Sequence, residues 1–366
     1  MGILEKIADI EKEISRTQKN KATEYHLGIL KAKLAKYRQE LLDIKTGSGG
    51  GRGEGFDVLK SGDARVALVG FPSVGKSTLL NCVTDTKSVI ASYEFTTLTC
   101  IPGNISYRGA NIQLLDLPGI IEGAAAGRGR GKQVIATART SDLILIILDA
   151  TKSLEQRRII ERELETMGIR LNSSPPNVTI RRKERGGISF TATVKQSQMT
   201  EGLATHILKE YKIHNAEVLI KEDVTMDQFI DAIDGKRRYI PALYAYNKID
   251  QLTIEEVDKL ARQPNTVMIS CEMQLNLDYL VDRVWRSLGL LRVFTKKRGV
   301  LPDFSEPLIL RSNSTVEHVC HVLHRSLASQ FKYAMVWGAS TKHQPQKVGF
   351  HHAVMDEDVI QIIKKC

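Results

Sequence analysis

Residues 70–77 have the composition and spacing of a phosphate-binding loop. They read GFPSVGKS and fit the pattern GxxxxGK[ST]. The glycines let backbone N–H groups surround phosphate oxygens, and the N-terminus of the following helix adds its positive dipole end. Lys76 can reach the β- and γ-phosphates as a catalytic residue, and the Ser77 hydroxyl can ligate magnesium. The residues expected to line the phosphates are Gly70, Phe71, Pro72, Ser73, Val74, Gly75, Lys76, Ser77 and Thr78.

Two further segments can complete a magnesium and γ-phosphate site. The first is DLPG, in which Asp116 can hold magnesium through water and Gly119 can offer its N–H to the γ-phosphate as a catalytic group. The second is YEFTT, where a mobile loop can bring Thr97 to the metal, with Thr96 as the alternative. An ordinary threonine pair in a strand remains the competing interpretation of that segment.

A third motif predicts guanine as the base. It is NKID, with Asn247, Lys248 and Asp250, and Ser270 and Cys271 follow further along the chain. The Asp250 carboxylate can accept hydrogen bonds from the guanine N1–H and exocyclic amine, which adenine does not supply. A site built on such paired polar groups discriminates strongly between bases. The backbone at Ser270 and Cys271 is expected near guanine O6.

Each of these motifs follows a short apolar segment that predicts a buried strand. The predicted strands are residues 65–69, 111–115, 143–148, 242–246 and 267–269. Helical stretches separate them, which is typical of βαβ units with a parallel sheet covered on both faces. The fold class is therefore α/β, with a doubly wound, mostly parallel sheet.

Outside this core the sequence contains four further parts, which are an N-terminal helical hairpin, a linker, an insert and a C-terminal domain. Residues 1–45 predict a helical hairpin, either a packing element or an RNA-contacting helix pair, and the Gly-rich residues 46–62 predict a linker. Residues 63–291 are the nucleotide domain, interrupted by an α+β insert at 170–236. The insert is expected to contain strands 177–182 and 188–194 joined as a hairpin by the turn 183–187, helix 201–213, strand 216–220 and helix 226–233. Its basic stretch Arg181–Lys183 is either a nucleic-acid contact or a solvated turn.

Residues 292–366 predict a last, smaller domain. Strands are expected at 308–310, 333–337 and 359–363, and Ser314 with Glu317 fits a capping box that opens a helix. His318, His321 and His324 lie on that helix and are interpreted as surface and packing residues. The domain has 11 basic and 6 acidic residues, which is consistent with a surface that faces RNA.

Composition excludes several classes of protein. The chain has 366 residues, 42% of them hydrophobic and 26% charged, as in globular proteins and unlike collagen or disordered chains. No apolar run approaches the roughly 20 residues that span a bilayer. The five scattered cysteines and the charged start, MGILEK, predict a reduced cytoplasmic protein. The formal net charge of +10 favours an RNA or ribosome partner.

Longer strings around these motifs resemble one family of GTPases. They are GFPSVGKSTLLN, YEFTTLT and DLPGIIEGAAAGRGRG, with QKNKATEYHLG and EFTTLTCIPG. They are similar to the developmentally regulated GTP-binding proteins, a branch of the Obg-related GTPases. The resemblance covers essentially the whole chain. It implies a P-loop GTPase domain, an insert like a domain of a small-subunit ribosomal protein, and a C-terminal β-grasp TGS domain.

The resemblance also implies function. It predicts GTP hydrolysis with magnesium held by Ser77 and Thr97, with Asp116 acting through water. Ribosomes and their RNA are the expected partners, together with a regulatory protein that contains zinc fingers; neither DNA nor a membrane is expected. The alternatives are a nucleotide-sensing scaffold, or a signalling GTPase that regulates growth, in which hydrolysis is only a slow reset.

Four positions bear on the mechanism of the resembled family. Ile120 stands where Ras-like enzymes have a water-orienting glutamine, so intrinsic turnover should be slow. Arg128 and Arg130 either stabilise developing charge or lie in an exposed switch loop. Ser73 replaces an asparagine that helps several Obg-related enzymes to hold potassium, which leaves potassium activation an open alternative.

Overall fold

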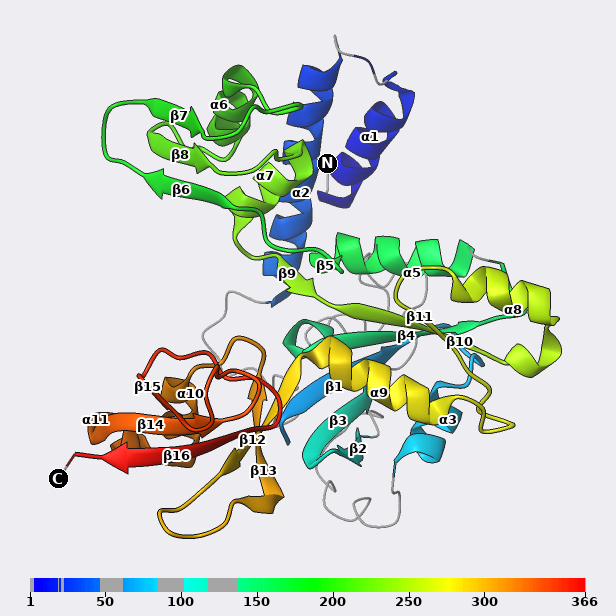
Figure 1. Ribbon diagram of the computed structural model, residues 1–366. Coiled ribbons are helices and arrows are strands. Elements are labelled where there is room, and N and C mark those ends of the chain that lie inside the picture. The colour runs from blue at the N-terminus through cyan, green and yellow to red at the C-terminus, as the bar shows by residue number, and fades with distance from the viewer. Residues whose placement is uncertain are drawn as a thin grey trace. The chain divides into compact units, whose positions relative to one another are not determined.

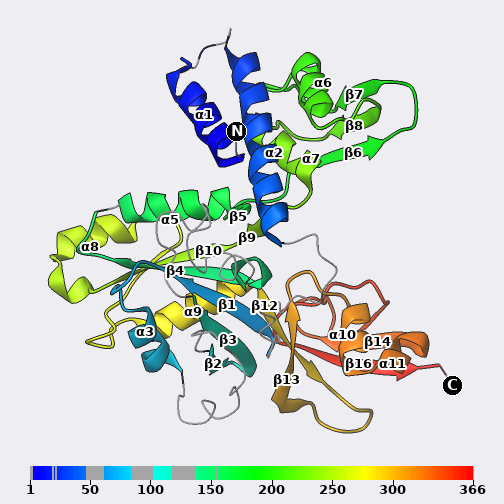
Figure 2. The same cartoon turned by 180° about the vertical axis from the view of Figure 1, so that it is seen from behind.

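A six-stranded sheet carries the expected nucleotide motifs (Figures 1 and 2). Its order is β11 (Thr266–Met268), β10 (Ala242–Asn247), β4 (Leu143–Asp149), β1 (Ala64–Val69), β3 (Ala110–Asp116) and β2 (Pro102–Tyr107). All neighbours are parallel except β2, which runs antiparallel to β3. The five predicted strands and their parallel pairing are confirmed. The edge strand β2 was not predicted.

The computed structural model describes residues 3–18, 20, 23–46, 62–84, 102–117, 137–153 and 155–365. It divides the chain into two units, of which one comprises 1–56, 121–139 and 158–240 and the other 57–120, 140–157 and 241–366. Several predicted features lie outside the described residues. They are Thr96 and Thr97, Gly119, Ile120, Arg128, Arg130 and nearly all of the linker.

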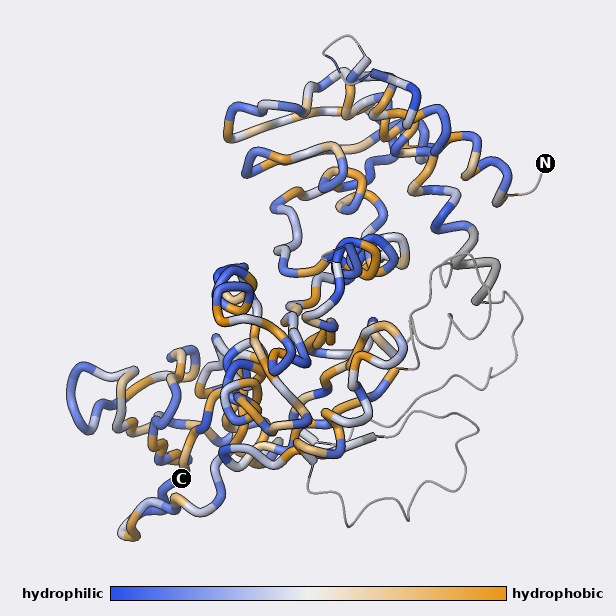
Figure 3. Tube along the Cα trace, turned by 90° about the vertical axis from the view of Figure 1, so that its right-hand side faces the viewer, coloured by the Kyte–Doolittle hydropathy of each residue, from blue (hydrophilic) through white to orange (hydrophobic). Residues whose placement is uncertain are grey.

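The sheet is buried because strands β1, β4 and β10 are apolar on both faces. Every residue of these three strands is buried, as is typical of parallel strands covered on both sides. In Figure 3 the apolar colouring concentrates in these strands, whereas outer loops are mostly polar. Described helices beside this sheet are α3 (Lys76–Val83), α8 (Ile254–Ala261) and α9 (Leu277–Leu288), with the 3-10 turn η2 (Ile249–Gln251). Helix α5 (Glu155–Thr166) begins in this unit and ends in the other.

The C-terminal part of the same unit is a five-stranded sheet. Its order is β13 (Asp303–Arg311), β12 (Leu290–Thr295), β16 (Asp358–Lys364), β14 (Phe331–Trp337) and β15 (Gln346–Val348). Helix α10 (Val316–Leu323) packs Val316, Val319 and Cys320 against one face of it, and α11 (Arg325–Ser329) follows. The three predicted strands are confirmed, and β12 and β15 are additional.

The helix cap predicted here is wrong by one residue. Thr315, not Ser314, is the N-cap of α10, and its N–H donates to His318 Nδ1 at 3.0 Å. Glu317 lies too early to reach the cap and faces His351 at 3.7 Å instead. The Ser-Glu spacing fits the sequence pattern, but the bridge between Thr315 and Ala353 fixes the helix start one residue later.

The other unit contains the helical hairpin and the insert. The hairpin is α1 (Ile3–Arg16) and α2 (Glu24–Thr46), joined by reciprocal hydrogen bonds between Asn20 and Thr23. The insert has β6 (Val178–Arg182), β7 (Ile188–Ala192), α6 (Glu201–Glu210), β8 (Ala216–Ile220) and α7 (Met226–Asp234). A two-stranded parallel pair, β5 (Ile169–Leu171) and β9 (Arg238–Ile240), lies at the two ends of the insert.

The predicted hairpin between the first two insert strands is wrong. The sheet order is β6-β8-β7, so β8 lies between them and pairs antiparallel with β6 and parallel with β7. Ala216, Val218 and Ile220 of β8 are buried, whereas β6 and β7 have no fully buried residue. The most apolar strand takes the centre of the sheet, where it is covered by α6 and α7.

Helix α2 packs against the insert rather than standing apart. Ala32 is fully buried in the same core as Leu203 and Phe229 of the insert. Gly28 makes this approach possible, because a Cβ there would lie 2.9 Å from both Leu203 Cδ1 and Met226 Sδ. The apolar side of α2 is therefore a packing surface for the insert.

Candidate functional site

The nucleotide motifs meet at one edge of the six-stranded sheet. Parallel strands β1, β3, β4 and β10 all end there, and their register pairs Leu68 with Asp116 and Asp149 with Asn247. Loops that leave the carboxyl ends of such strands are where open α/β sheets bind ligands. The sheet thus places segments far apart in the chain beside one another.

The loop between β1 and α3 contains tight turns. Ser73 and Gly75 have positive φ angles of 63° and 95°. A Cβ on Gly75 would lie 2.3 Å from Asn247 Nδ2, so the position has room only for glycine. A Cβ on Gly70 would lie 2.5 Å from the Ile147 carbonyl oxygen. Both glycines of the motif are thus required by close backbone packing.

Lys76 lies across this loop at the start of α3. Its Nζ donates to the carbonyl oxygens of Gly70 at 2.9 Å and Phe71 at 2.8 Å. Burial lowers the pKa of Lys76 below its ordinary value, and the nearby Asp116 carboxylate opposes this lowering. The ammonium is held by carbonyl dipoles alone, which leaves its positive charge available to an anion in the loop.

Ser77 and Asp116 form the candidate metal position. Ser77 Oγ donates to Asp116 Oδ2 at 3.0 Å. Asp116 Oδ1 is buried and has no hydrogen-bond partner among the residues that the structure describes. A buried carboxylate oxygen without a partner is costly, and a hydrated cation beside it would satisfy it. A hydroxyl beside a carboxylate is also a donor set of the oxygen type that magnesium prefers. These two residues therefore fit a magnesium ion.

Asn247 joins the phosphate loop to the base loop. Its Nδ2 donates to the Val74 carbonyl at 2.9 Å, and its Oδ1 accepts from the Cys271 N–H at 3.0 Å. The side chain is 3% exposed. Its amide oxygen and one amide N–H are engaged with the protein, so the side chain fixes the positions of the two loops, and its predicted contact with the base stays a prediction.

Lys248 is held by an acid that the sequence interpretation had missed. Its Nζ donates to Asp149 Oδ2 at 2.6 Å, while Asp149 Oδ1 accepts from the Thr151 N–H at 3.0 Å. Burial alone would raise the pKa of Asp149, but the hydrogen bonds from Lys248 and Thr151 outweigh it and lower the pKa. Asp149 ends a buried strand just as Asp116 does. This position at the end of a strand is the feature of the sequence that could have identified Asp149 as a site residue.

The expected guanine-recognising carboxylate lies beside Ser270. Ser270 Oγ donates to Asp250 Oδ1 at 2.6 Å and accepts from the Met273 N–H at 3.2 Å. Ser270 is fully buried, which fixes the orientation of the carboxylate. Burial, with a smaller effect of Cys82, raises the pKa of the Cys271 thiol to about 11, so this group stays neutral.

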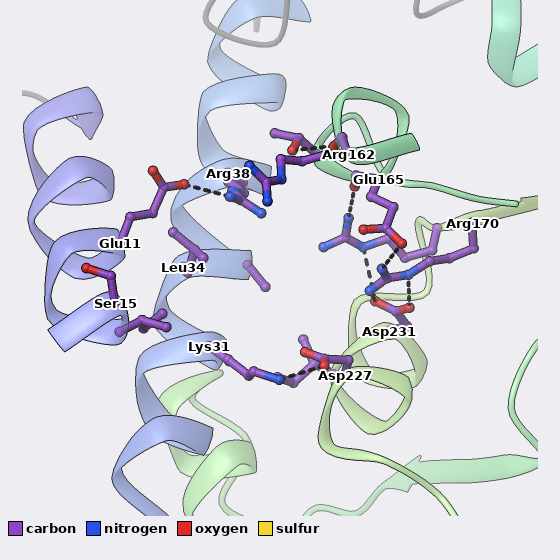
Figure 4. A pocket seen from close by; sticks show the side chains of 15 residues that line it. Glu11, Ser15, Lys31, Leu34, Arg38, Arg162, Glu165, Arg170, Asp227 and Asp231 are labelled. Atoms are coloured by element: carbon purple, nitrogen blue, oxygen red, sulfur yellow. Dashed lines mark hydrogen bonds and ion pairs between the residues drawn. The ribbon is translucent and has the colours of Figure 1, made fainter. Parts of the chain in front are cut away.

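A separate cavity of about 580 Å³ lies in the unit formed by the hairpin and the insert (Figure 4). Its charged side chains are largely paired with one another. Arg38 donates to Glu11 at 2.6 Å, and Lys31 to Asp227 at 2.7 Å. Arg170 donates to the buried Asp231 at 2.7 Å. These charges compensate each other, and the described residues that line this cavity include none from the nucleotide motifs.

Fold and motifs together define a P-loop GTPase with a C-terminal TGS domain. The family described as 50S ribosome-binding GTPase matches residues 65–182, the C-terminal region of the same domain matches 185–290, and the TGS domain matches 291–364.

The chain is 66% identical to Developmentally-regulated GTP-binding protein 2 of Homo sapiens, over 100% of both chains. It is 63% identical to the Dictyostelium discoideum homologue, again over 100% of both. A solved GTP binding protein from Pyrococcus horikoshii OT3 is 15% identical over 82% of this chain and 99% of that one, with a TM-score of 0.45. The chain belongs to the developmentally regulated GTP-binding protein family, and the family predicted from the motif strings is confirmed. No described helix has the length and apolarity to cross a membrane.

Proposed function

We propose that the loops at the carboxyl edge of the six-stranded sheet bind GTP and magnesium and are the site of hydrolysis in this GTPase. The observation that carries this assignment is the chain of contacts from Val74 through Asn247 to Cys271, with Asp250 beside Ser270. It joins a loop shaped for phosphates to a carboxylate suited to guanine. Only a nucleotide spans both groups.

Each residue of the predicted site then has its own task. Lys76 places a positive charge on the β- and γ-phosphates. Ser77 ligates magnesium, and Asp116 holds it through water, while Thr97 and the Gly119 N–H are proposed for the γ-phosphate side. Magnesium supplies the charge that offsets the charge on the phosphates as the γ-phosphoryl group leaves. Ile120 cannot orient water, so we propose slow intrinsic turnover.

The base assignment is tested by Asp250→Asn. The amide cannot accept two hydrogen bonds from guanine, so GTP affinity should fall sharply, and binding should shift toward xanthosine nucleotides. Titration of fluorescent nucleotides measures both affinities. Asp258→Asn is the control, because Asp258 is an exposed acid on α8 that pairs with Arg262 at 2.8 Å. Unchanged GTP affinity of the Asp250 variant would refute the assignment.

We propose further that this GTPase acts as a nucleotide switch on ribosomes, with a zinc-finger-containing regulatory partner. The matching family is described as ribosome-binding, and the chain carries a formal net charge of +10. The insert also exposes Arg181, Arg182, Lys183 and Arg185 around its first turn, where they can meet RNA phosphates, although Lys183 also lies 3.7 Å from Glu217. A cytoplasmic location and a role in translation follow from this proposal.

Co-sedimentation with ribosomes tests the switch. The protein is compared with a non-hydrolysable GTP analogue and with GDP at one physiological salt concentration, because basic proteins bind RNA non-specifically at low salt. Stronger sedimentation with the analogue supports the switch, and equal sedimentation refutes it. A scaffold that uses hydrolysis only as a reset would gain function when hydrolysis is blocked with GTP still bound, whereas the proposed enzyme would lose it.

A further inference from the structure

The cavity in the unit of the hairpin and the insert has more basic than acidic side chains in its lining. Five of its lining residues are basic and four are acidic. The basic residues are Lys31, Arg38, Arg162, Arg170 and Arg237. Its volume of about 580 Å³ falls within the range of about 300–1,000 Å³ that is usual for sites of small molecules. The nucleotide loops give this cavity no task.

Two of the basic side chains are held in place by a buried acid. Arg170 donates to Asp231 at 2.7 Å, and Arg237 lies 3.3 Å from the same carboxylate. The Asp231 side chain is 3% exposed and that of Arg237 is 10% exposed. Breaking a buried ion pair leaves an uncompensated charge and is costly. These three residues are therefore a fixed part of the wall.

The other three basic side chains are held weakly or have no acid beside them. Arg38 pairs with Glu11 and Lys31 with Asp227, but about half of each acid is exposed, 49% and 51%. Exposed pairs of this kind contribute little to stability, so a competing anion displaces the acids at little cost. Arg162 has no ion pair among the residues that the structure describes.

Arg38 and Arg162 extend toward one another from two helices (Figure 4). Arg38 lies on α2, and Arg162 lies on α5. Like charges that converge repel each other, and an anion between them replaces this repulsion with attraction. Guanidinium groups present planar pairs of N–H donors, which match the oxygens of a phosphate group. The convergence therefore indicates a phosphate-binding position.

Four apolar side chains complete the lining. They are Ile14 of α1, Leu34 and Ala35 of α2, and Ile230 of α7. A phosphate ion alone would leave these side chains in contact with water, whereas a ring attached to the phosphate would cover them. The lining thus suits a ligand that has both an anionic group and an apolar part.

We propose that this cavity binds a small phosphate ester with a ring-shaped body. Its phosphate lies between Arg38 and Arg162, and its body lies against the apolar side chains. The volume of the cavity favours a small molecule over a segment of an acidic protein. This site is separate from the nucleotide loops and does not rest on the function proposed for them.

Isothermal titration calorimetry of ADP into the full chain tests the proposal. The chain is first saturated with GDP and magnesium, so that the proposed nucleotide loops are occupied. Arg162→Gln should weaken ADP binding by about tenfold to 100-fold, the effect of losing one charge-assisted hydrogen bond. Arg158→Gln is the control, because Arg158 is an exposed arginine one turn earlier on α5 and does not line the cavity.

A second variant should strengthen binding. Glu11→Gln removes the acid that competes for Arg38, so ADP affinity should rise by up to about fivefold. A purely structural role of this ion pair predicts no such gain. Glu13→Gln is the matched control, since Glu13 lies on α1, pairs with His26 and does not line the cavity.

The absence of ADP binding at millimolar concentration would overturn the proposal. Equal losses in the Arg162 and Arg158 variants would also overturn it, because ADP would then be an adventitious ion on a basic surface. Inorganic pyrophosphate that binds as tightly as ADP would overturn the assignment of a ring-shaped body. Arg162→Gln should leave GDP affinity and basal GTP hydrolysis unchanged, whereas Asp250→Asn should weaken GDP binding. The two proposals therefore fail separately.

Discussion

Asn247→Ala tests whether one buried amide holds the two nucleotide loops together. The side chain makes two hydrogen bonds, to the Val74 carbonyl at 2.9 Å and from the Cys271 N–H at 3.0 Å, and both are buried. Truncation leaves two buried backbone groups without partners. Each such group costs about 1–3 kcal/mol, so we expect a loss of about 2–6 kcal/mol in the free energy of unfolding.

The same truncation should weaken nucleotide binding. The phosphate loop and the base loop lose the bridge that fixes their separation, so part of the binding free energy is spent on ordering them. If ordering the two loops costs about 1.4 kcal/mol of binding free energy, GDP affinity falls tenfold, and we expect a loss of affinity at least this large. Urea denaturation measures the first effect, and titration with fluorescent GDP measures the second.

Asn276→Ala is the matched control. Asn276 also donates one hydrogen bond, from its Nδ2 to the Met268 carbonyl at 2.7 Å, but it touches neither Val74 nor Cys271. One carbonyl then loses its partner instead of two backbone groups, so we expect a loss of about 1–3 kcal/mol and nearly unchanged GDP affinity. The reasoning is refuted if the two variants behave alike in both assays.

Three further outcomes follow from the structure. Gly28→Val should destabilise the packing of α2 on the insert by about 1–3 kcal/mol, as measured by hydrogen exchange in α2. Gly202→Val is the control and should be nearly neutral, because no atom lies within 4 Å of its Cβ position. Asp149 has a lowered pKa, so its stabilising effect is present above its unfolded pKa of about 4 and is lost as pH falls through the folded value. The difference in unfolding free energy between the native chain and Asp149→Asn should therefore be largest at neutral pH and shrink below about pH 4. A difference that stays constant with pH would contradict this assignment. Cys271, with its pKa raised to about 11 by burial, should resist alkylation at pH 8 in the folded protein and react after denaturation, as read by mass spectrometry.

The sequence alone determined where the nucleotide loops lie. The phosphate loop, DLPG and NKID each follow a short run of buried residues, and a run that is apolar on both faces is typical of a central parallel strand. The chemistry of Lys76, Ser77 and Asp250 is also local, because it depends on residue type and on the strand end that carries it. These features needed no knowledge of distant neighbours.

Only the tertiary structure decided which residues support those loops. Asn247 and Val74 are separated by 173 positions, and Lys248 and Asp149 by 99, so no local spacing indicates that they meet. The place of β8 between β6 and β7 was likewise decided by burial against α6 and α7, which competes with the shorter hairpin that the turn residues favoured. Contacts between distant segments depend on how whole faces pack, and that information is spread over the entire chain.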